Sequence, residues 1–166
     1  MIQIETERKF LIRMPNIALI SELNGVRIKK IEQTYLLDSS CNARVRKIEE
    51  NLKITYIKTT KKRISTLSVY EDECEIDEQR YQDELTHKDE SKNTVFKTRY
   101  CIPFGDHILE IDVYPFWNDR AVLEIELANE NECFSLPEFI SVIKEVSDDP
   151  RYKNTRLAKQ IPMDII

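Results

Sequence analysis

The chain has 166 residues, of which 33% are charged and 41% are apolar, with a formal net charge of −5 and a pI near 5.2. This length fits one domain, residues 1–166, and is sufficient to bury a core. The acidic balance argues against nucleic acid or an anionic membrane surface as the main partner. No run of about 18 apolar residues is present, so no membrane-spanning helix is expected.

Cysteine and glycine usage narrows the function classes further. The four cysteines are scattered without a CxxC pair, which indicates reduced thiols, and the charged N-terminus does not fit a secretory signal. A cytoplasmic location is therefore expected. Only two glycines occur, Gly25 and Gly105, too few for a glycine-rich phosphate loop of the Walker or Rossmann type. If the protein handles phosphate, side chains must hold it.

Most periodic segments alternate with period two, which predicts strands. In chain order the expected strands cover residues 5–12, 31–37, 42–48, 52–59, 63–76 (one strand or two), 94–102, 107–114 and 121–128. The third and fourth form a hairpin, and so do the two that flank "PFGD", where Pro103 and Gly105 favour a turn.

Helices are expected at four places between and after these strands. A short helix follows Pro15 over residues 16–23, and residues 77–90 show weak helical periodicity. The clearest helix begins at Ser135, where Ser135 and Glu138 fit a capping box before an apolar stripe. The segment "SDDPRYKNTRLA" ends in a last helical turn. The predicted fold class is α+β, mainly β, with about eight antiparallel strands and a few helices outside.

Charged residues recur as doublets two positions apart, and each doublet carries one sign. The doublets are Glu5/Glu7, Arg44/Arg46, Glu73/Glu75, Lys97/Arg99, Glu110/Asp112 and Glu124/Glu126. Residues two apart share one face of a strand, and the opposite faces here are largely apolar. In a single strand such a charged face would normally meet water.

The segregation of sign favours a different interpretation, in which the sheet closes with its charged faces inward. Solvated faces normally mix signs, and arginine suits bidentate contacts with phosphate or carboxylate. Enclosed charges are costly unless they are paired. Clustered carboxylates suit Mg²⁺ or Mn²⁺ through oxygen ligands, and clustered cations suit a polyanion. A metal-bound polyphosphate would satisfy both groups.

At these residues the chain resembles a known superfamily. "IETERKF" is similar to the ExExK signature of the CYTH superfamily, also called triphosphate tunnel metalloenzymes. It is followed in order by "EQTYLL", "ARVRK", "ITYIK", "ECEI", "FKTRYCIPF", "LEIDVY", "VLEIEL" and "EVSDDPRYKNTRLA". The resemblance runs from Ile2 to about Ala158 and is closest to small single-domain bacterial members. It implies an eight-stranded antiparallel closed β-barrel tunnel that binds triphosphate and divalent metal inside.

The resemblance also implies roles for individual residues. The metal ligands would be Glu5, Glu7, Glu124 and Glu126. The phosphate-binding cations would be Lys9, Arg44, Arg46, Lys58, Lys97 and Arg99, with Arg151 at the tunnel mouth. Tyr35 would pair with Lys97 near the attacking water, which makes these two the catalytic candidates.

Two alternative roles stay open for four further acids and for one basic run. Glu73, Glu75, Glu110 and Asp112 would bind a second metal or position the basic side chains, and the positioning role is favoured for Glu73 and Asp112. The basic run Lys61, Lys62 and Arg63 departs from the family's glycine-rich loop. It would either add charge at an entrance or be solvated, and solvation is favoured.

The leading functional prediction is metal-dependent hydrolysis of the terminal phosphoanhydride of inorganic triphosphate. Three alternatives stay open: a nucleoside or thiamine triphosphatase or a class IV-like adenylate cyclase on the same site, a non-catalytic polyphosphate-binding module, and a β-sandwich with solvated charges. A homodimer also stays open.

Overall fold

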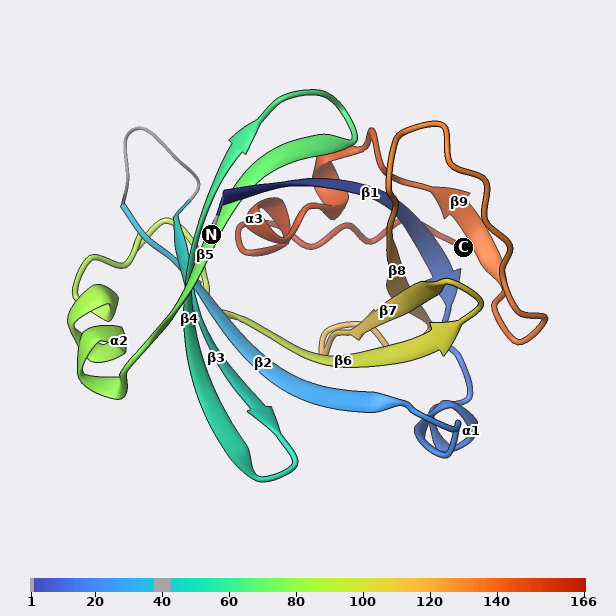
Figure 1. Cartoon of the computed structure of the whole chain (residues 1–166), viewed down its shortest axis with the longest axis horizontal. Coiled ribbons are helices and arrows are strands. Elements are labelled where there is room, and N and C mark those ends of the chain that lie inside the picture. Colours follow the sequence, from blue (N-terminus) through green and yellow to red (C-terminus); the bar gives the residue numbers. More distant parts are fainter. Residues whose placement is uncertain (1, 38–42) are drawn as a thin grey trace.

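The computed structural model describes residues 2–37 and 43–166 and shows a closed barrel of antiparallel strands (Figure 1). Neighbours in the barrel are hydrogen-bonded in the order β5-β4-β3-β2-β6-β7-β8-β1, and β5 pairs with β1 to close it. The strands are β1 (Ile2–Arg13), β2 (Arg27–Tyr35), β3 (Arg44–Glu50), β4 (Lys53–Arg63), β5 (Ser68–Ile76), β6 (Val95–Phe104), β7 (His107–Val113) and β8 (Arg120–Glu126). The predicted eight-stranded closed barrel is confirmed.

Strand β1 makes the closure because it is long enough to serve two neighbours on one edge. Its first half pairs with β5, and Ile4 lies opposite Tyr70. Its second half pairs on the same edge with a ninth strand, β9 (Val142–Glu145), and on the other edge with β8. Strand β9 thus satisfies backbone groups of β1 that β5 does not reach.

The predicted helix from Ser135 is wrong. Residues 135–141 contain only a turn, in which Ile140 N donates to Pro137 O at 3.0 Å, and β9 follows directly. The apolar stripe instead packs Leu136, Phe139 and Ile140 onto the outside of the barrel as an irregular segment. The free edge of β1 and this apolar surface outweigh the local helical signal.

The other helices are found near their predicted positions. Helix α1 (Ile17–Ser21) is capped by Asn16, and α2 (Glu78–Leu85) is capped by Asp77, which accepts from Arg80 N at 2.7 Å. A 3₁₀ turn, η1 (Pro150–Tyr152), leads into α3 (Asn154–Leu157). In the described part of the chain no helix is long and apolar enough to cross a membrane.

The largest apolar core lies outside the barrel wall. It joins the outer faces of β1, β6, β7 and β8 to α1 and the irregular segment before β9, and its fully buried members include Ile12, Ile20, Leu109, Ile111, Leu123 and Ile125. A smaller cluster seats α2 on β3 and β4 through Tyr81 and Val45. The apolar faces therefore point outward, as predicted, although an irregular segment covers much of the surface that helices were expected to cover.

A third cluster closes one end of the barrel. Leu11, Tyr35 and Val95, from the inner faces of three strands, pack with Tyr152 and Leu157 of η1 and α3. In Figure 1 the α3 region lies behind the opening of the barrel. We call η1 and α3 together the cap.

Candidate functional site: the charged bore

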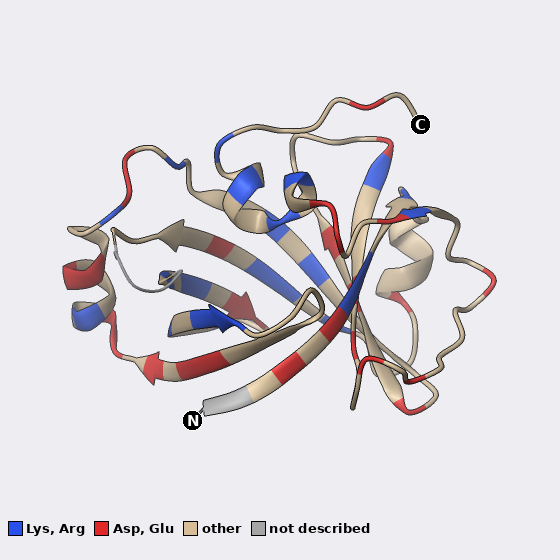
Figure 2. Cartoon of the chain, turned by 90° about the horizontal axis from the view of Figure 1, so that it is seen from above, with Lys and Arg blue, Asp and Glu red and all other residues tan. Residues whose placement is uncertain are grey.

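Cross-strand register decides which side chains face the interior. Directly opposed residues in an antiparallel pair share a face. Lys9 lies opposite Glu124, Glu124 lies opposite Glu110, and Arg99 lies opposite Asp112, so all share the inner face. Figure 2 shows acidic and basic residues alternating with other residues along the strands. The resulting bore holds a cavity of about 210 Å³ lined by Glu5, Glu7, Lys29, Ile31, Arg46, Ile48, Lys61, Glu71, Glu73, Arg99, Glu110, Glu124 and Glu126.

Glu124 stands at the centre of an ion-pair network. Its carboxylate lies 2.7 Å from Lys9 Nζ and 2.5 Å from Arg99 Nη2. Burial acts to raise the pKa of Glu124, but the charges of Lys9 and Arg99 outweigh it and hold the pKa well below its usual range. Burial likewise acts to lower the pKa of Lys9, and Glu124 and Glu7 hold it above its usual value. All three groups are therefore ionised at neutral pH.

Asp112 holds the two cations of β6. Its carboxylate accepts from Lys97 Nζ at 2.5 Å and from Arg99 Nε at 2.6 Å, and it is fully buried. Burial, and secondarily the charge of Arg99, lower the pKa of Lys97 to about 8. Arg99 also contacts Glu110. Asp112 and Glu110 therefore act as partners that position cations, which agrees with the interpretation favoured for Asp112.

Arg44 and Arg46 form a second cationic group on β3. Arg46 Nη2 donates to Thr59 Oγ1 at 3.1 Å and contacts Glu73, and Arg44 lies 3.6 Å from Glu71. Burial and then the charge of Arg44 lower the pKa of Arg46 to about 10. Within the described residues the Nε atoms of both guanidiniums are buried without a hydrogen-bond partner. Buried donors without acceptors favour an anionic ligand.

The acidic side of the bore brings together carboxylates that repel one another. Glu7 lies opposite Glu126 across β1 and β8. Burial and then the charge of Glu5 raise the pKa of Glu126, and burial and then a hydrogen bond with Glu71 raise that of Glu5. This all-oxygen donor set suits Mg²⁺ or Mn²⁺. Among the residues described, however, no three carboxylate, imidazole or thiol groups converge in a metal-holding arrangement. Glu124 is held by its two cations.

Lys58 lies outside the bore, so its predicted placement is wrong. The turn at Asn51 and Leu52 sets Arg46 opposite Ile57 and puts Lys58 opposite the outward-facing Val45. The Lys58 ammonium pairs with Glu84 of α2 at 2.7 Å.

Two other site residues make contacts that differ from the predicted ones. Arg151 is exposed and held by Asp149 at 2.7 Å and by Asp164 at 3.1 Å, which directs it to the segment after the cap. The predicted contact of Tyr35 with Lys97 is not formed. The Tyr35 hydroxyl accepts from Gln33 Nε2 at 2.8 Å, whereas Lys97 bonds to Asp112.

The bore also contains residues that sequence reasoning missed. Lys61 bonds to Glu5 at 2.8 Å and contacts Glu71, so the expectation that it is solvated is wrong. Lys29 lines the same cavity from β2, and Lys153, between η1 and α3, lines a second cavity that shares Glu7 and Lys61 with it. Counting outward from the turn at residues 51–52 would have identified Lys61, because odd-numbered residues of β4 face inward. Glu75 shares this inward register but is exposed at the end of β5.

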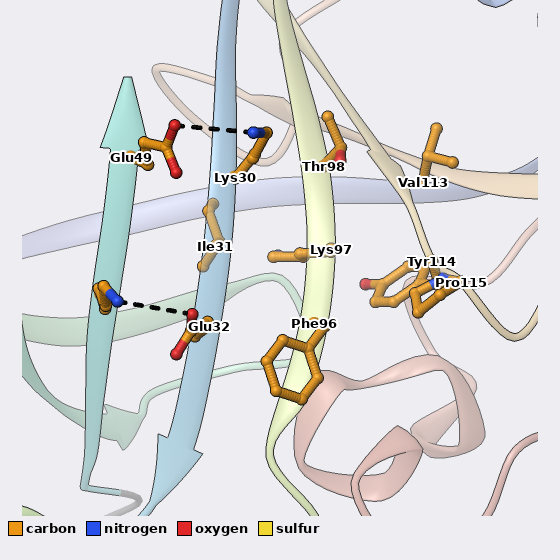
Figure 3. A pocket seen from close by; sticks show the side chains of 11 residues that line it. Lys30, Ile31, Glu32, Glu49, Phe96, Lys97, Thr98, Val113, Tyr114 and Pro115 are labelled. Carbon is orange, nitrogen blue, oxygen red and sulfur yellow. Dashed lines mark ion pairs between the residues drawn. The ribbon is translucent and has the colours of Figure 1, made fainter. Parts of the chain in front are cut away.

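A separate groove of about 380 Å³ lies on the outer face of β2, β3 and β6 (Figure 3). Its surface lysines are already paired: Lys30 lies 3.6 Å from Glu49, and Lys47 lies 3.8 Å from Glu32. This neutral arrangement does not suit a polyanion, so the bore is the candidate site.

An antiparallel barrel with a bore of opposed carboxylates and clustered cations defines the class of triphosphate tunnel proteins. The chain is 33% identical over 157 residues to an inorganic triphosphatase of Acetivibrio thermocellus, and the alignment covers 93% of both chains. By this similarity the chain belongs to the inorganic triphosphatase family. No family model matches the sequence.

Solved structures agree with this assignment. The inorganic triphosphatase NE1496 superposes with a TM-score of 0.56 at 26% identity, covering 95% of this chain and 96% of that one. The PH1819 protein of Pyrococcus horikoshii OT3 shares the fold, with a TM-score of 0.60 at 20% identity over 76% of this chain and 80% of its own.

Proposed function

We propose that this protein hydrolyses the terminal phosphoanhydride of inorganic triphosphate. The observation that carries the proposal is the inward direction of Arg44, Arg46, Lys97 and Arg99, which lie in one bore together with a dense group of carboxylates. A linear polyanion with charge on every unit, bound together with a divalent cation, is the ligand that such a narrow lining of both signs suits. The relative from Acetivibrio thermocellus, named an inorganic triphosphatase, supports the same substrate.

The basic side chains would bind and orient the phosphate chain. Arg44 and Arg46 have unsatisfied donors, and Arg99 is fixed by Asp112 at 2.6 Å, so its orientation is set before substrate arrives. Preorganised cations stabilise charge that moves onto the leaving phosphate without a reorganisation cost. Lys97, with its pKa near 8, would carry its proton at neutral pH and neutralise charge on a phosphate oxygen.

The acidic side would hold a divalent cation, with Mg²⁺ or Mn²⁺ as the proposed cofactor. Glu5, Glu7 and Glu126 are the best candidates because their mutual repulsion makes a cation favourable there. Glu124 would join them only by exchanging contacts with Lys9 or Arg99. A divalent cation, when bound, polarises phosphate oxygens and makes water a better nucleophile at neutral pH. The cytoplasmic location and the homodimer stay predictions.

Phosphate release from inorganic triphosphate, ATP and thiamine triphosphate tests the proposal, with Mg²⁺, with Mn²⁺ and with EDTA. We expect turnover of inorganic triphosphate to exceed that of the other substrates and to fall to background in EDTA. Tight triphosphate binding without phosphate release under any of these conditions would instead identify a polyphosphate-binding module. Conversion of ATP to a cyclic product would identify a cyclase.

A further inference from the structure

The outer face of β2 lies between two covered parts of the barrel. Helix α2 packs on β3 and β4, whereas α1 and the irregular segment before β9 pack on β1, β6, β7 and β8. Figure 1 shows α2 and α1 at opposite ends of the molecule, with β2 running between them. Phe96, on the neighbouring β6, is 52% exposed, and Ile28 and Ile54 are exposed as well. Exposed apolar side chains that gather on one face are typical of an interface.

Four charged side chains on this face form a checkerboard, which we call the charge quartet. On β2, Lys30 and Glu32 share the outer face. On β3, Glu49 lies opposite Lys30. Lys47 in turn lies opposite Glu32. Each charge therefore has a neighbour of the opposite sign both along its strand and across to the next one, and Figure 3 shows the two ion pairs that cross from β2 to β3.

The charge quartet is only loosely paired within the chain. Lys30 Nζ lies 3.6 Å from Glu49 Oε1, and the Lys30 side chain is 73% exposed. Lys47 Nζ lies 3.8 Å from Glu32 Oε1. Both distances are longer than a hydrogen bond. The ammonium and carboxylate groups of the quartet therefore keep hydrogen-bonding capacity for a partner.

A checkerboard of charges is complementary to a second copy of itself. A twofold axis that runs along the strands between β2 and β3 lays the face on its own image and exchanges the two strands. Lys30 then meets the partner's Glu49. Glu32 likewise meets the partner's Lys47. Every charge of the quartet thus faces a charge of opposite sign, as an isologous interface requires.

The same axis also matches the aromatic side chains that flank the quartet. Phe96 lies next to Glu32 in the register of β2 and β6. Tyr56 lies next to Lys47 in the register of β3 and β4. Phe96 would therefore pack against the partner's Tyr56 on each side of the axis. Because exposed ion pairs contribute little by themselves, the aromatic contacts would supply most of the affinity and the charges would set the alignment.

We propose that the outer face of β2 and β3, with Phe96 at its edge, is the interface of a homodimer. Two copies pack these faces together about the twofold axis along the strands. The barrel wall is curved, so the contact is small and we expect a dissociation constant on the order of 10 μM. The proposal does not rest on the hydrolysis of triphosphate, because none of these side chains lines the central cavity.

Sedimentation velocity of the full chain, from about 1 to about 200 μM, tests the proposal. We expect monomer to convert to dimer across this range. Phe96→Ser should raise the dissociation constant at least about tenfold, because it removes both aromatic contacts. Tyr70→Ser is the matched control, since Tyr70 is an exposed aromatic residue on another strand, β5, and it should leave the constant unchanged. A chain that stays monomeric throughout, or a dimer that Phe96→Ser does not weaken, would overturn the interface.

Charge reversal tests the pairing itself. Glu32→Lys leaves two positive charges at positions 32 and 47, and Lys47→Glu leaves two negative ones. Each variant alone should therefore be monomeric at about 50 μM. An equimolar mixture of the two should form a heterodimer, because position 32 of each copy then faces an opposite charge at position 47 of the other. A folding defect cannot produce this rescue.

Lys62→Glu is the control for the change in net charge. Lys62 is exposed on β4, opposite Tyr70 and away from the quartet, so this variant should dimerise like the wild type. An equimolar mixture of Glu32→Lys and Lys47→Glu that stays monomeric would overturn the proposed pairing, and so would either variant alone with the dissociation constant of the wild type.

Discussion

At the scale of single residues, the direction of a lysine side chain decides which partner it pairs with. Lys58 and Lys61 lie on the same strand three positions apart, and that odd spacing puts them on opposite faces. Lys58 pairs with Glu84 outside the barrel, and Lys61 pairs with Glu5 inside it. The two lysines therefore differ in function although they have the same chemistry.

Arg46→Gln should lower kcat/KM for inorganic triphosphate by about 100-fold, the loss of one or two charged phosphate contacts. Lys58→Gln should change it less than about twofold, because the Lys58 ammonium faces α2. Steady-state phosphate release measures both. A large effect of Lys58→Gln would mean that the β4 register differs in solution.

The pH dependence of KM should report on Lys97. Because its pKa is about 8, lowered from its ordinary value by burial, Lys97 loses its charge as the pH rises through 8, and triphosphate affinity should fall there. Lys97→Arg keeps the charge at higher pH and should move the alkaline rise in KM upward by at least one pH unit. An identical alkaline limb in both proteins would assign it to another group.

Glu126→Gln should stabilise the metal-free protein while lowering activity. Burial and Glu5 raise the pKa of Glu126, so the folded protein binds its proton more tightly than the unfolded chain does. Folding stability therefore falls as the pH rises from the ordinary carboxyl pKa through the raised one. Glu126→Gln should raise the Tm at pH 7 in EDTA, with the gain fading near pH 4, and should lower kcat about 100-fold.

Thermal unfolding across that pH range, with wild type as the reference, checks the stability part of this prediction. A lower Tm for Glu126→Gln at pH 7 would contradict it, and would indicate that Glu126 has a stabilising partner in solution.

At the scale of elements, the cap packs on the apolar side chains at one end of the bore. Leu157 is 4% exposed and packs in the same cluster as Leu11 and Tyr35, and Tyr114 Oη donates to Asn154 Oδ1 at 2.7 Å. This packing fixes the position of Lys153, which lies between η1 and α3 and lines a cavity beside the cap. Cap stability and the geometry of that cavity are therefore linked.

Leu157→Ala should lower the free energy of unfolding by about 3 kcal/mol, the usual cost of a cavity at a buried leucine. Ile165→Ala, at a fully exposed position, should change it by less than about 0.5 kcal/mol. Urea denaturation measures both, and equal effects of the two variants would show that the cap does not pack on the barrel in solution.

At the scale of the whole molecule, a net acidic protein encloses a bore in which carboxylates and cations lie close together. The net charge of −5 would repel a polyanion at long range, whereas the cations proposed to bind it lie inside the bore. Raising salt from 0.1 M to 1 M shortens the screening length from about 10 Å to about 3 Å.

We therefore expect salt to act on polyanion binding in two opposite ways. It screens the long-range repulsion, which favours binding, and it weakens the contacts inside the bore, which disfavours binding. Buried pairs are screened less than exposed charges.

Local sequence patterns determine the strands of this protein, whereas contacts between distant segments decide several of its site residues. Local patterns in the sequence determined the eight strands and the inward charged face. These patterns are the alternation with period two, the segregation of sign by strand and the turn residues, and they suffice because side-chain direction along a strand is a local property. Arg46, Arg99 and Glu124 were found in this way. Only the tertiary structure decided that residues 142–145 form a strand, that Lys61 rather than Lys58 enters the bore, and that Arg151 turns away from it. The first two outcomes depend on a free strand edge and on the register of a hairpin, which partners distant in the chain and the exact length of a turn create. The third depends on the acids Asp149 and Asp164, which hold the Arg151 side chain once the 3₁₀ turn and the C-terminal segment are in place.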